Sequence, residues 1–148
     1  MSEHGTLVAA RYGIARSAKW PAAERAHVAR SPHCTACRRP GLRVEVHHIF
    51  PFHFCVCLGR ADLELDERNL VTLCPEHHLL LGHFDDYESM NLRVRGEARG
   101  RFHGMTDVQL RASDAWRKLA ARRPAHLGEM TRDRRRELRE TMDRHMPR

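Results

Sequence analysis

The chain has 148 residues and a mass of 17.2 kDa, which suits one compact domain with arms and leaves little room for a second domain. Lys and Arg number 26 against 19 Asp and Glu, and the isoelectric point near 9.8 makes nucleic acid the expected partner. No apolar run approaches the roughly 18 residues that a membrane span needs, and residues 1–10 lack a secretory pattern, so we expect no membrane contact and a cytoplasmic location.

Cysteine and histidine usage favours metal binding over disulfide bonds. Five cysteines cannot all pair within one chain, and two of them, Cys34 and Cys37, are separated by only two residues. More than half of the 12 histidines fall between His33 and His83. Thiolate and imidazole are the ligands that zinc prefers, so we expect the chemistry of the protein in this segment.

The first expected elements are a helix, a turn and a strand. Pro21 suits a helix start, where its missing N–H costs nothing, and we expect a short helix over residues 22–30. Residues 34–41 have the Cys, Arg, Pro and Gly content of a tight turn with two sulfurs at its base. Residues 42–49 alternate between apolar and charged side chains, which predicts a half-buried strand that ends in two histidines.

A second strand and a helix complete a ββα arrangement. Residues 69–74 are apolar and β-branched enough for an extended segment. Pro75 stands where a helix would begin, and the helix is expected to continue through residue 81. Gly82 is a natural stop for it.

The C-terminal third is predicted to be helical and basic. Residues 106–109 have the form of a capping box, and apolar residues at helical spacing predict one amphipathic helix that runs to about residue 123. Beyond Pro124 the chain is mostly Arg and Glu, with Leu138 and Met142 as sparse apolar points four residues apart. This tail is either a solvated charged arm or an arm that grips phosphates. Trp20 and Trp116 are expected to pack in the core.

Two pairs of metal-ligand residues share the same spacing. Cys34 with Cys37, and Cys74 with His77, each leave two residues between the ligands, and together they supply the four ligands of a structural zinc site. The alternative is a set of buried thiols with a surface histidine. Cys55 and Cys57 are expected to be core or loop thiols.

A second set of residues overlaps this one and resembles the HNH endonuclease family. It comprises Glu-Val-His-His-Ile-Phe-Pro at 45–51, Asn69, and His78 nine residues later. Residues 16–21, 46–53, 63–66 and 80–83 also look like one bacterial and phage branch of that family, so the resemblance spans about 16–101. The chain departs from the pattern in three places: His77 stands where a second cysteine is usual, Tyr87 replaces a tryptophan, and the segment 54–62 is longer.

The resemblance implies a fold and a domain division. The fold is α+β, a small ββα-metal finger with a zinc knuckle, flanked by helices. It divides the chain into an N-terminal arm (1–15), an HNH nuclease domain (16–101) and a basic helical region (102–148).

The resemblance also implies hydrolysis of DNA phosphodiester bonds. His48 would be the general base, because neutral imidazole suits proton transfer near neutral pH. His47 and His78 would bind a catalytic divalent ion, either Mg²⁺, Mn²⁺, Ni²⁺ or Zn²⁺, with His83 as a third ligand. Asn69 would hold His48 by its side-chain amide or brace the loop.

Two geometric conditions accompany these roles. His83 follows His78 by five residues, about 140° off the same face of an ideal helix, so a break at Gly82 must swing it back. His47 and His48 point to opposite faces of a regular strand, so the strand must end or twist there.

Other interpretations stay open at this point. A zinc-dependent DNA-binding module that does not cut would need the zinc ligands and the basic charge, but not the two adjacent histidines and Asn69. A toxin-type nuclease would share the chemistry with different partners. His53 is a candidate to position the site residues without binding the ion itself. The sequence leaves the DNA specificity, the catalytic ion and the oligomeric state undetermined.

Overall fold

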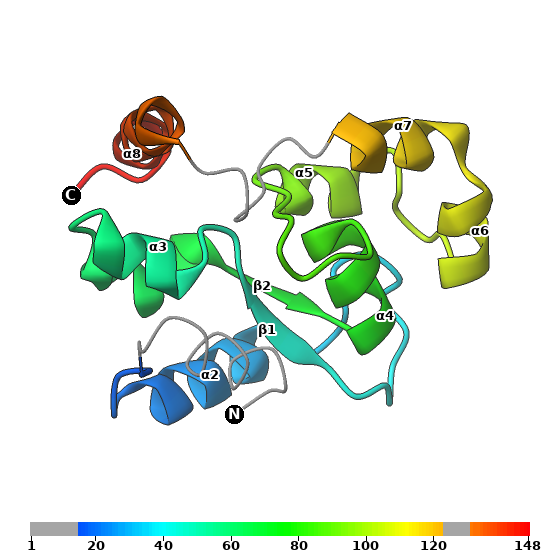
Figure 1. Ribbon diagram of the computed structural model, residues 1–148. Coiled ribbons are helices and arrows are strands. Elements are labelled where there is room, and N and C mark those ends of the chain that lie inside the picture. Colours follow the sequence, from blue (N-terminus) through cyan, green and yellow to red (C-terminus); the bar gives the residue numbers. More distant parts are fainter. Residues whose placement is uncertain (1–14, 123–130) are drawn as a thin grey trace.

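The computed structural model describes residues 15–122 and 131–148. The predicted N-terminal arm therefore lies almost wholly outside the described residues, as does residue 123, where the amphipathic helix was expected to end. Helices and a small sheet alternate along the chain (Figure 1). In chain order the elements are α2 (Trp20–Arg30), β1 (Glu45–His48), α3 (Phe52–Cys57), η1 (Ala61–Glu64), η2 (Glu67–Asn69), β2 (Leu70–Leu73), α4 (Pro75–His77), η3 (His78–Gly82), α5 (Val94–Arg99), α6 (Asp107–Ala112), α7 (Asp114–Arg122) and α8 (Arg132–His145).

The two strands form one antiparallel two-stranded sheet, and the chain between them contains α3, η1 and η2. Glu45 pairs with Leu73 and His48 pairs with Leu70. Helix α2 packs against one face of the sheet, and η3 packs against the other (Figure 1). The sheet is therefore the central layer that carries side chains toward two separate environments, and the predicted α+β class is confirmed.

The predicted elements of the finger are found with small shifts. Pro21 stands in the first turn of α2, which begins at Trp20, two residues earlier than expected. β1 covers only the second half of the segment 42–49 and ends at His48, where the chain bends. Pro75 opens α4 as predicted.

The prediction of one amphipathic helix after Thr106 was wrong. The capping box is present, with the Thr106 hydroxyl accepting from the Gln109 backbone N–H and the Gln109 side chain accepting from the Thr106 backbone N–H. The helix nevertheless stops at Ser113, which has an extended backbone, and α7 begins at the next residue. Trp116 on α7 is buried, as is Trp20 on α2, and both were expected in the core.

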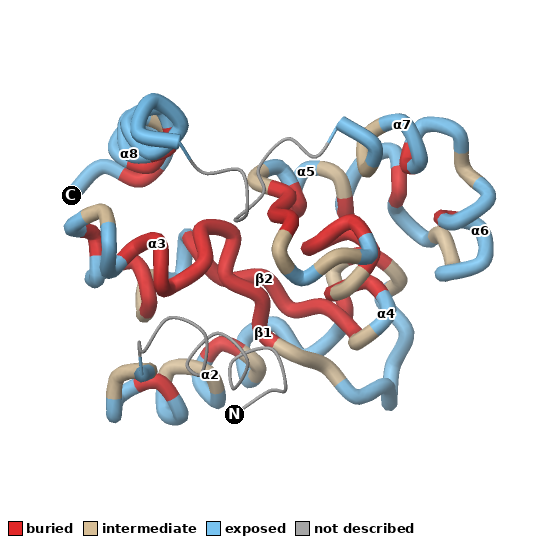
Figure 2. Tube along the Cα trace, viewed as in Figure 1, coloured by how far each residue is buried: buried red, intermediate tan, exposed pale blue. Residues whose placement is uncertain are grey.

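Helix α8 is not a free arm, because it docks beside α3 (Figure 1). Leu138 and Met142 are buried in the main hydrophobic cluster, while most of the helix surface is exposed (Figure 2). The guanidinium of Arg60, only 1% exposed, donates to Asp62, to Asp143 on α8 and to the carbonyl of Met146. Buried charges need such partners, so Arg60 fixes the position of the helix.

Within the described residues, no helix is both long enough and apolar enough to cross a membrane.

Candidate metal centres

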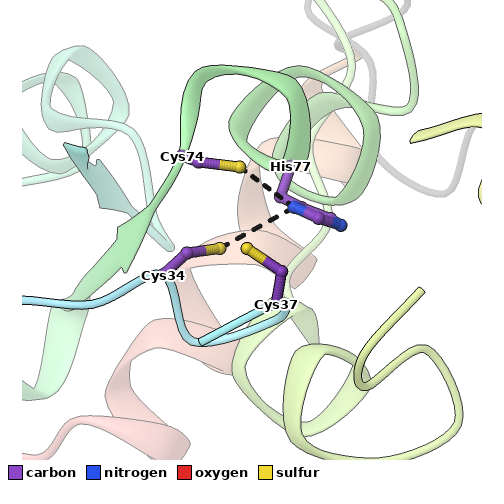
Figure 3. A group of neighbouring side chains, drawn as sticks. All are labelled: Cys34, Cys37, Cys74 and His77. Carbon is purple, nitrogen blue, oxygen red and sulfur yellow. Dashed lines mark hydrogen bonds between the residues drawn. The ribbon is translucent and has the colours of Figure 1, made fainter. Parts of the chain in front are cut away.

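Four side chains from two segments meet beside the end of β2, and we call them the zinc cluster: Cys34, Cys37, Cys74 and His77 (Figure 3). The first two lie on a tight turn that closes with a hydrogen bond from the Arg38 N–H to the Cys34 carbonyl. Arg38 takes a positive φ of 56° there. Cys74 precedes α4, and His77 ends it. The turn thus sets the spacing of Cys34 and Cys37, and one turn of helix sets the spacing of Cys74 and His77.

The geometry of the zinc cluster fits a four-coordinate metal. One ligand atom from each residue lies within 4.8 Å of every other. The Nδ1 atom of His77 is 3.0 Å from the sulfur of Cys74 and 3.7 Å from that of Cys34. Tetrahedral zinc would separate a sulfur and a nitrogen ligand by about 3.6 Å. The four residues therefore form a cluster that could hold a metal such as zinc, as the spacing predicted.

The surroundings prepare this cluster for a cation. The other ring nitrogen of His77, Nε2, donates to the Met105 carbonyl at 2.6 Å, which leaves Nδ1 to present its lone pair to the sulfurs. A hydrogen bond from Cys74 lowers the pKa of Cys34 to about 3, with a further contribution from His77. The same bond raises the pKa of Cys74, so the two sulfurs share a proton, and thiolate is the form that binds metal.

Cys55 and Cys57 stay outside the zinc cluster, in agreement with the sequence prediction. Cys55 is buried and donates to the Phe50 carbonyl, and burial raises the pKa of its thiol to about 12. Cys57 is exposed at the end of α3.

A second group of side chains that could hold a metal lies where β1 meets η3, and we call it the histidine cluster: His47, His78 and His83. One ring nitrogen of each lies within 4.8 Å of the other two. The ring centroids are 5.0 to 5.1 Å apart, and all three side chains are buried. His47 comes from β1, and the other two flank η3. The structure therefore brings together the three residues predicted as ligands of a second ion.

A π-helical turn accounts for the position of His83. The segment η3 (His78–Gly82) is wound more widely than an α-helix, so residues five apart return to the same side. From the sequence, a break at Gly82 was expected to bring His83 back toward His78. The structure achieves this with the wider winding, which begins four residues earlier, at His78. Such a turn leaves carbonyl groups without helical partners, and a buried carbonyl needs a donor.

Downstream residues supply those donors. The Leu80 carbonyl accepts from the indole N–H of Trp116 at 2.9 Å. Asn91 donates its side-chain amide to Leu81 and its backbone N–H to Gly82. These bonds hold the wide turn in place, so packing of α7 against η3 also supports the histidine cluster.

Gly82 leaves space for the ring of His47. A methyl group built at this position would lie 3.0 and 3.1 Å from two His47 ring atoms and 3.3 Å from the His78 ring. The first two distances are shorter than ordinary carbon contacts of about 3.5 to 4.0 Å. The glycine therefore allows the histidine rings to approach the backbone of η3.

Hydrogen bonds also orient the histidine cluster. Nδ1 of His83 donates to the Ser89 carbonyl at 2.8 Å, so Nε2 is the nitrogen that can coordinate a metal. Glu45, two residues before His47 on β1, places a carboxylate oxygen 3.6 Å from Nδ1 of His78. A carboxylate at this position can hold an imidazole ligand in one orientation.

His48 lies on the other face of the sheet from the histidine cluster. Its ring packs against Trp20, with centroids 4.5 Å apart, and Nε2 donates to the Glu64 carbonyl at 2.8 Å. Nδ1 then carries the lone pair, and it lies 3.4 Å from a nitrogen of Arg16, the donor in this contact. His47 and His48 both lie within β1, which ends only at His48, so the two rings point to opposite faces as in a regular strand and do not meet in one cluster.

Asn69 braces the loop after β1 by hydrogen bonds from its side chain to backbone groups. Its amide nitrogen donates to the carbonyls of Phe50 and Leu63, and its amide oxygen accepts from the Phe50 N–H. The side chain is fully buried. Of the two roles expected for Asn69, the structure places it in the second.

Three contributors to these sites were not identified from the sequence. Tyr87 places its ring 5.1 Å from that of His83, in the position noted only as a departure from the family pattern. Glu64 links His48 to the segment before α2 through its carbonyl and its carboxylate, which accepts from the Ser17 N–H. Arg16 lies against the Trp20 ring. Only their proximity in the fold reveals these roles.

Comparisons with protein-family models, with curated proteins and with solved structures found no match.

Proposed function

We propose that the chain is an HNH-type endonuclease that hydrolyses DNA phosphodiester bonds with one structural zinc ion and one catalytic divalent ion. The observation that carries this proposal is the presence of two buried metal-ligand clusters together with an oriented histidine, His48, that follows the cluster member His47 on β1. A zinc-binding scaffold would need only the first cluster. The second cluster would supply the metal ion that hydrolysis needs, and His48 would supply the general base.

His48 is suited to accept a proton from water. Its Nε2 donates to the Glu64 carbonyl, which fixes the ring tautomer and leaves Nδ1 as the basic atom. The contact with Trp20 holds the plane of the ring. His48 therefore acts as the general base through Nδ1, in a position that needs no rearrangement of the side chain.

The histidine cluster would hold the catalytic ion, and one of its members, His47, is the sequence neighbour of His48. A divalent cation bound there neutralises charge on the phosphate and the departing oxygen. In the described part of the chain, β1 pairs with β2 along one edge and with no strand along the other. A phosphodiester lying across this edge would meet His47 on one face and His48 on the other.

Charge supports a polyanionic substrate. The formal net charge is +7, and arginines crowd the exposed surface of α8. Part of this charge is internally paired, as in the ion pairs of Arg134 with Glu137 and of Arg136 with Asp133. The remainder gives a sequence-independent attraction to phosphates.

The second candidate is a DNA-binding module that contains zinc and does not cut. It is favoured by the same basic charge and by the zinc cluster, but it gives no role to the histidine cluster or to the tautomer of His48. The two candidates differ in one measurable property, which is product formation.

The deciding experiment incubates supercoiled plasmid with the purified chain in Mg²⁺, Mn²⁺, Ni²⁺ or Zn²⁺ and separates nicked, linear and degraded DNA. We expect cleavage with at least one ion and a loss of about 100-fold or more in His48→Ala, the scale of a positioned general base. Zinc content and melting temperature should be unchanged in this variant. Absence of product with every ion would favour the binding module, and full activity of His48→Ala would overturn the assignment of the base.

A further inference from the structure

Arg16 lies in an aromatic clamp formed by Trp20 and Phe52. Its guanidinium carbon is 4.7 Å from the centroid of the Trp20 ring and 4.3 Å from that of Phe52. Both distances fall within the range of cation–π attraction. The two rings come from α2 and α3, so the clamp depends on the packing of these helices on either side of Arg16.

The clamp leaves the hydrogen-bonding capacity of Arg16 largely unused. A guanidinium has five N–H donors in one plane. Among the described residues, its contacts amount to one long bond of 3.4 Å to Nδ1 of His48, and it forms no ion pair with a carboxylate. Burial is the main cause that lowers the pKa of Arg16, partly opposed by the charges of Glu64 and Glu24.

This arrangement is unusual for a partly buried cation. The buried Arg60 has two carboxylates and a carbonyl as partners, whereas Arg16 has two aromatic rings and a neutral imidazole. Aromatic rings attract the charge but accept no hydrogen bonds in the guanidinium plane, so donors remain at the edge of that plane. That edge matches two oxygens of a phosphate.

From these contacts we infer that Arg16 is a phosphate-binding residue that holds the substrate backbone against the Nδ1 side of His48. The inference rests on the proposed function for its substrate, a DNA phosphodiester. The fixed guanidinium plane would bind the phosphate in two-point contact, and the bond to His48 places that contact beside the general base. Arg16 takes no proton in this role.

The test compares Arg16→Gln and Arg16→Lys with the parent in two measurements. The first is equilibrium binding to a short fluorescent DNA duplex, with zinc bound and no further divalent ion added, over a series of salt concentrations. The second is the kinetics of DNA cleavage. Arg25→Gln removes an exposed charge from α2 and serves as the matched control.

We expect Arg16→Gln to weaken DNA binding about tenfold, as for the loss of a hydrogen-bonded charge. The slope of log affinity against log salt should fall by about one, since one phosphate contact is lost. KM should rise more than kcat falls. Arg16→Lys should keep the salt slope but raise KM, because an ammonium cannot make the planar two-point contact. Arg25→Gln should change KM less than either variant does.

The outcomes separate this inference from the proposed function. If the parent cleaves DNA but both Arg16 variants match it in KM and salt slope, the role of Arg16 is wrong and the nuclease stands. If the parent binds DNA without cleaving it, and Arg16→Gln lowers the slope of log affinity against log salt by about one, the phosphate contact stands and the nuclease proposal fails. A lower melting temperature with unchanged binding would make Arg16 structural only. If Arg16→Gln does not fold, Arg16→Lys decides by its KM.

Discussion

The contact between Gly82 and the histidine cluster can be tested by adding one methyl group. In Gly82→Ala the new carbon would meet the His47 ring at 3.0 and 3.1 Å. Restoring ordinary contact requires a displacement of about 0.5 to 1 Å, and the backbone of η3 is held by bonds from Asn91 and Trp116. The His47 ring is therefore the part that should move.

Opposing contributions make the stability change small and the functional change large. Overpacking costs about 1 to 3 kcal/mol. Replacing glycine by alanine within a helical segment returns about 1 kcal/mol. The net loss of unfolding free energy should thus be about 0 to 2 kcal/mol. A ligand displaced by up to 1 Å should lower cleavage by roughly 10- to 100-fold.

The assay combines urea unfolding, zinc analysis, calorimetric titration of the catalytic ion and plasmid cleavage. Gly96→Ala is the control, because its methyl group meets nothing within 4 Å on α5, and it should raise stability slightly with normal ion binding. We expect Gly82→Ala to keep its zinc and to bind the second ion more weakly. Parental ion affinity and parental cleavage in Gly82→Ala would refute the argument that this glycine positions the His47 ring.

Three further predictions concern zinc, the loop and pH. Cys34→Ser, or chelation of the parent, should unfold the finger and abolish cleavage together, since structural zinc contributes folding free energy, and a folded zinc-free protein by circular dichroism would contradict this. Asn69→Ala should lower unfolding free energy by about 2 to 4 kcal/mol, because three buried hydrogen bonds are lost, and denaturant titration measures it. Burial, with the charge of Arg16, lowers the pKa of His53 to about 4, so the folded state resists a proton that an unfolded histidine accepts. The contribution of neutral His53 to the free energy of unfolding should be fully present above about pH 6.5 and fall by up to about 3 kcal/mol toward pH 4. His53→Leu should flatten this part of the plot of unfolding free energy against pH.

The local elements and the zinc cluster could be predicted because each depends on short-range signals. Pro21 and Pro75 mark helix starts, and the repeated spacing of two residues brings a cysteine and its partner ligand to one side of a turn. A hydrogen bond from the Thr35 N–H to the Thr72 carbonyl on β2 then places Cys34 near Cys74. None of these steps requires knowledge of distant side chains.

The rest depended on tertiary contacts that a pattern does not contain. The winding of η3 is maintained by Trp116, 36 positions beyond the carbonyl that it bonds. The amphipathic pattern after Thr106 is continuous, so the break at Ser113 could not be seen in it. The docking of α8 depends on Arg60, which composition alone suggests to be on the surface.

The role of His48 shows the same limit. Alternation along a strand correctly indicated that His47 and His48 face opposite ways, but it could not say what each would meet. The structure supplies Trp20 and the Glu64 carbonyl on one face and the histidine cluster on the other. Whether the two faces serve one reaction is the question that the cleavage assay addresses.

The wide turn η3 can be understood as an α-helical turn that accommodates one additional residue. An ordinary helix would bring residues four apart to one face, so deletion of Leu79, which is only half-buried, should let η3 rewind while both histidines stay on the same side. A shortened chain that still binds the second ion would show that the extra residue was tolerated as an insertion. Because His77 and His78 both precede the deleted position, such a change would move His83 relative to the zinc cluster without altering either ligand set.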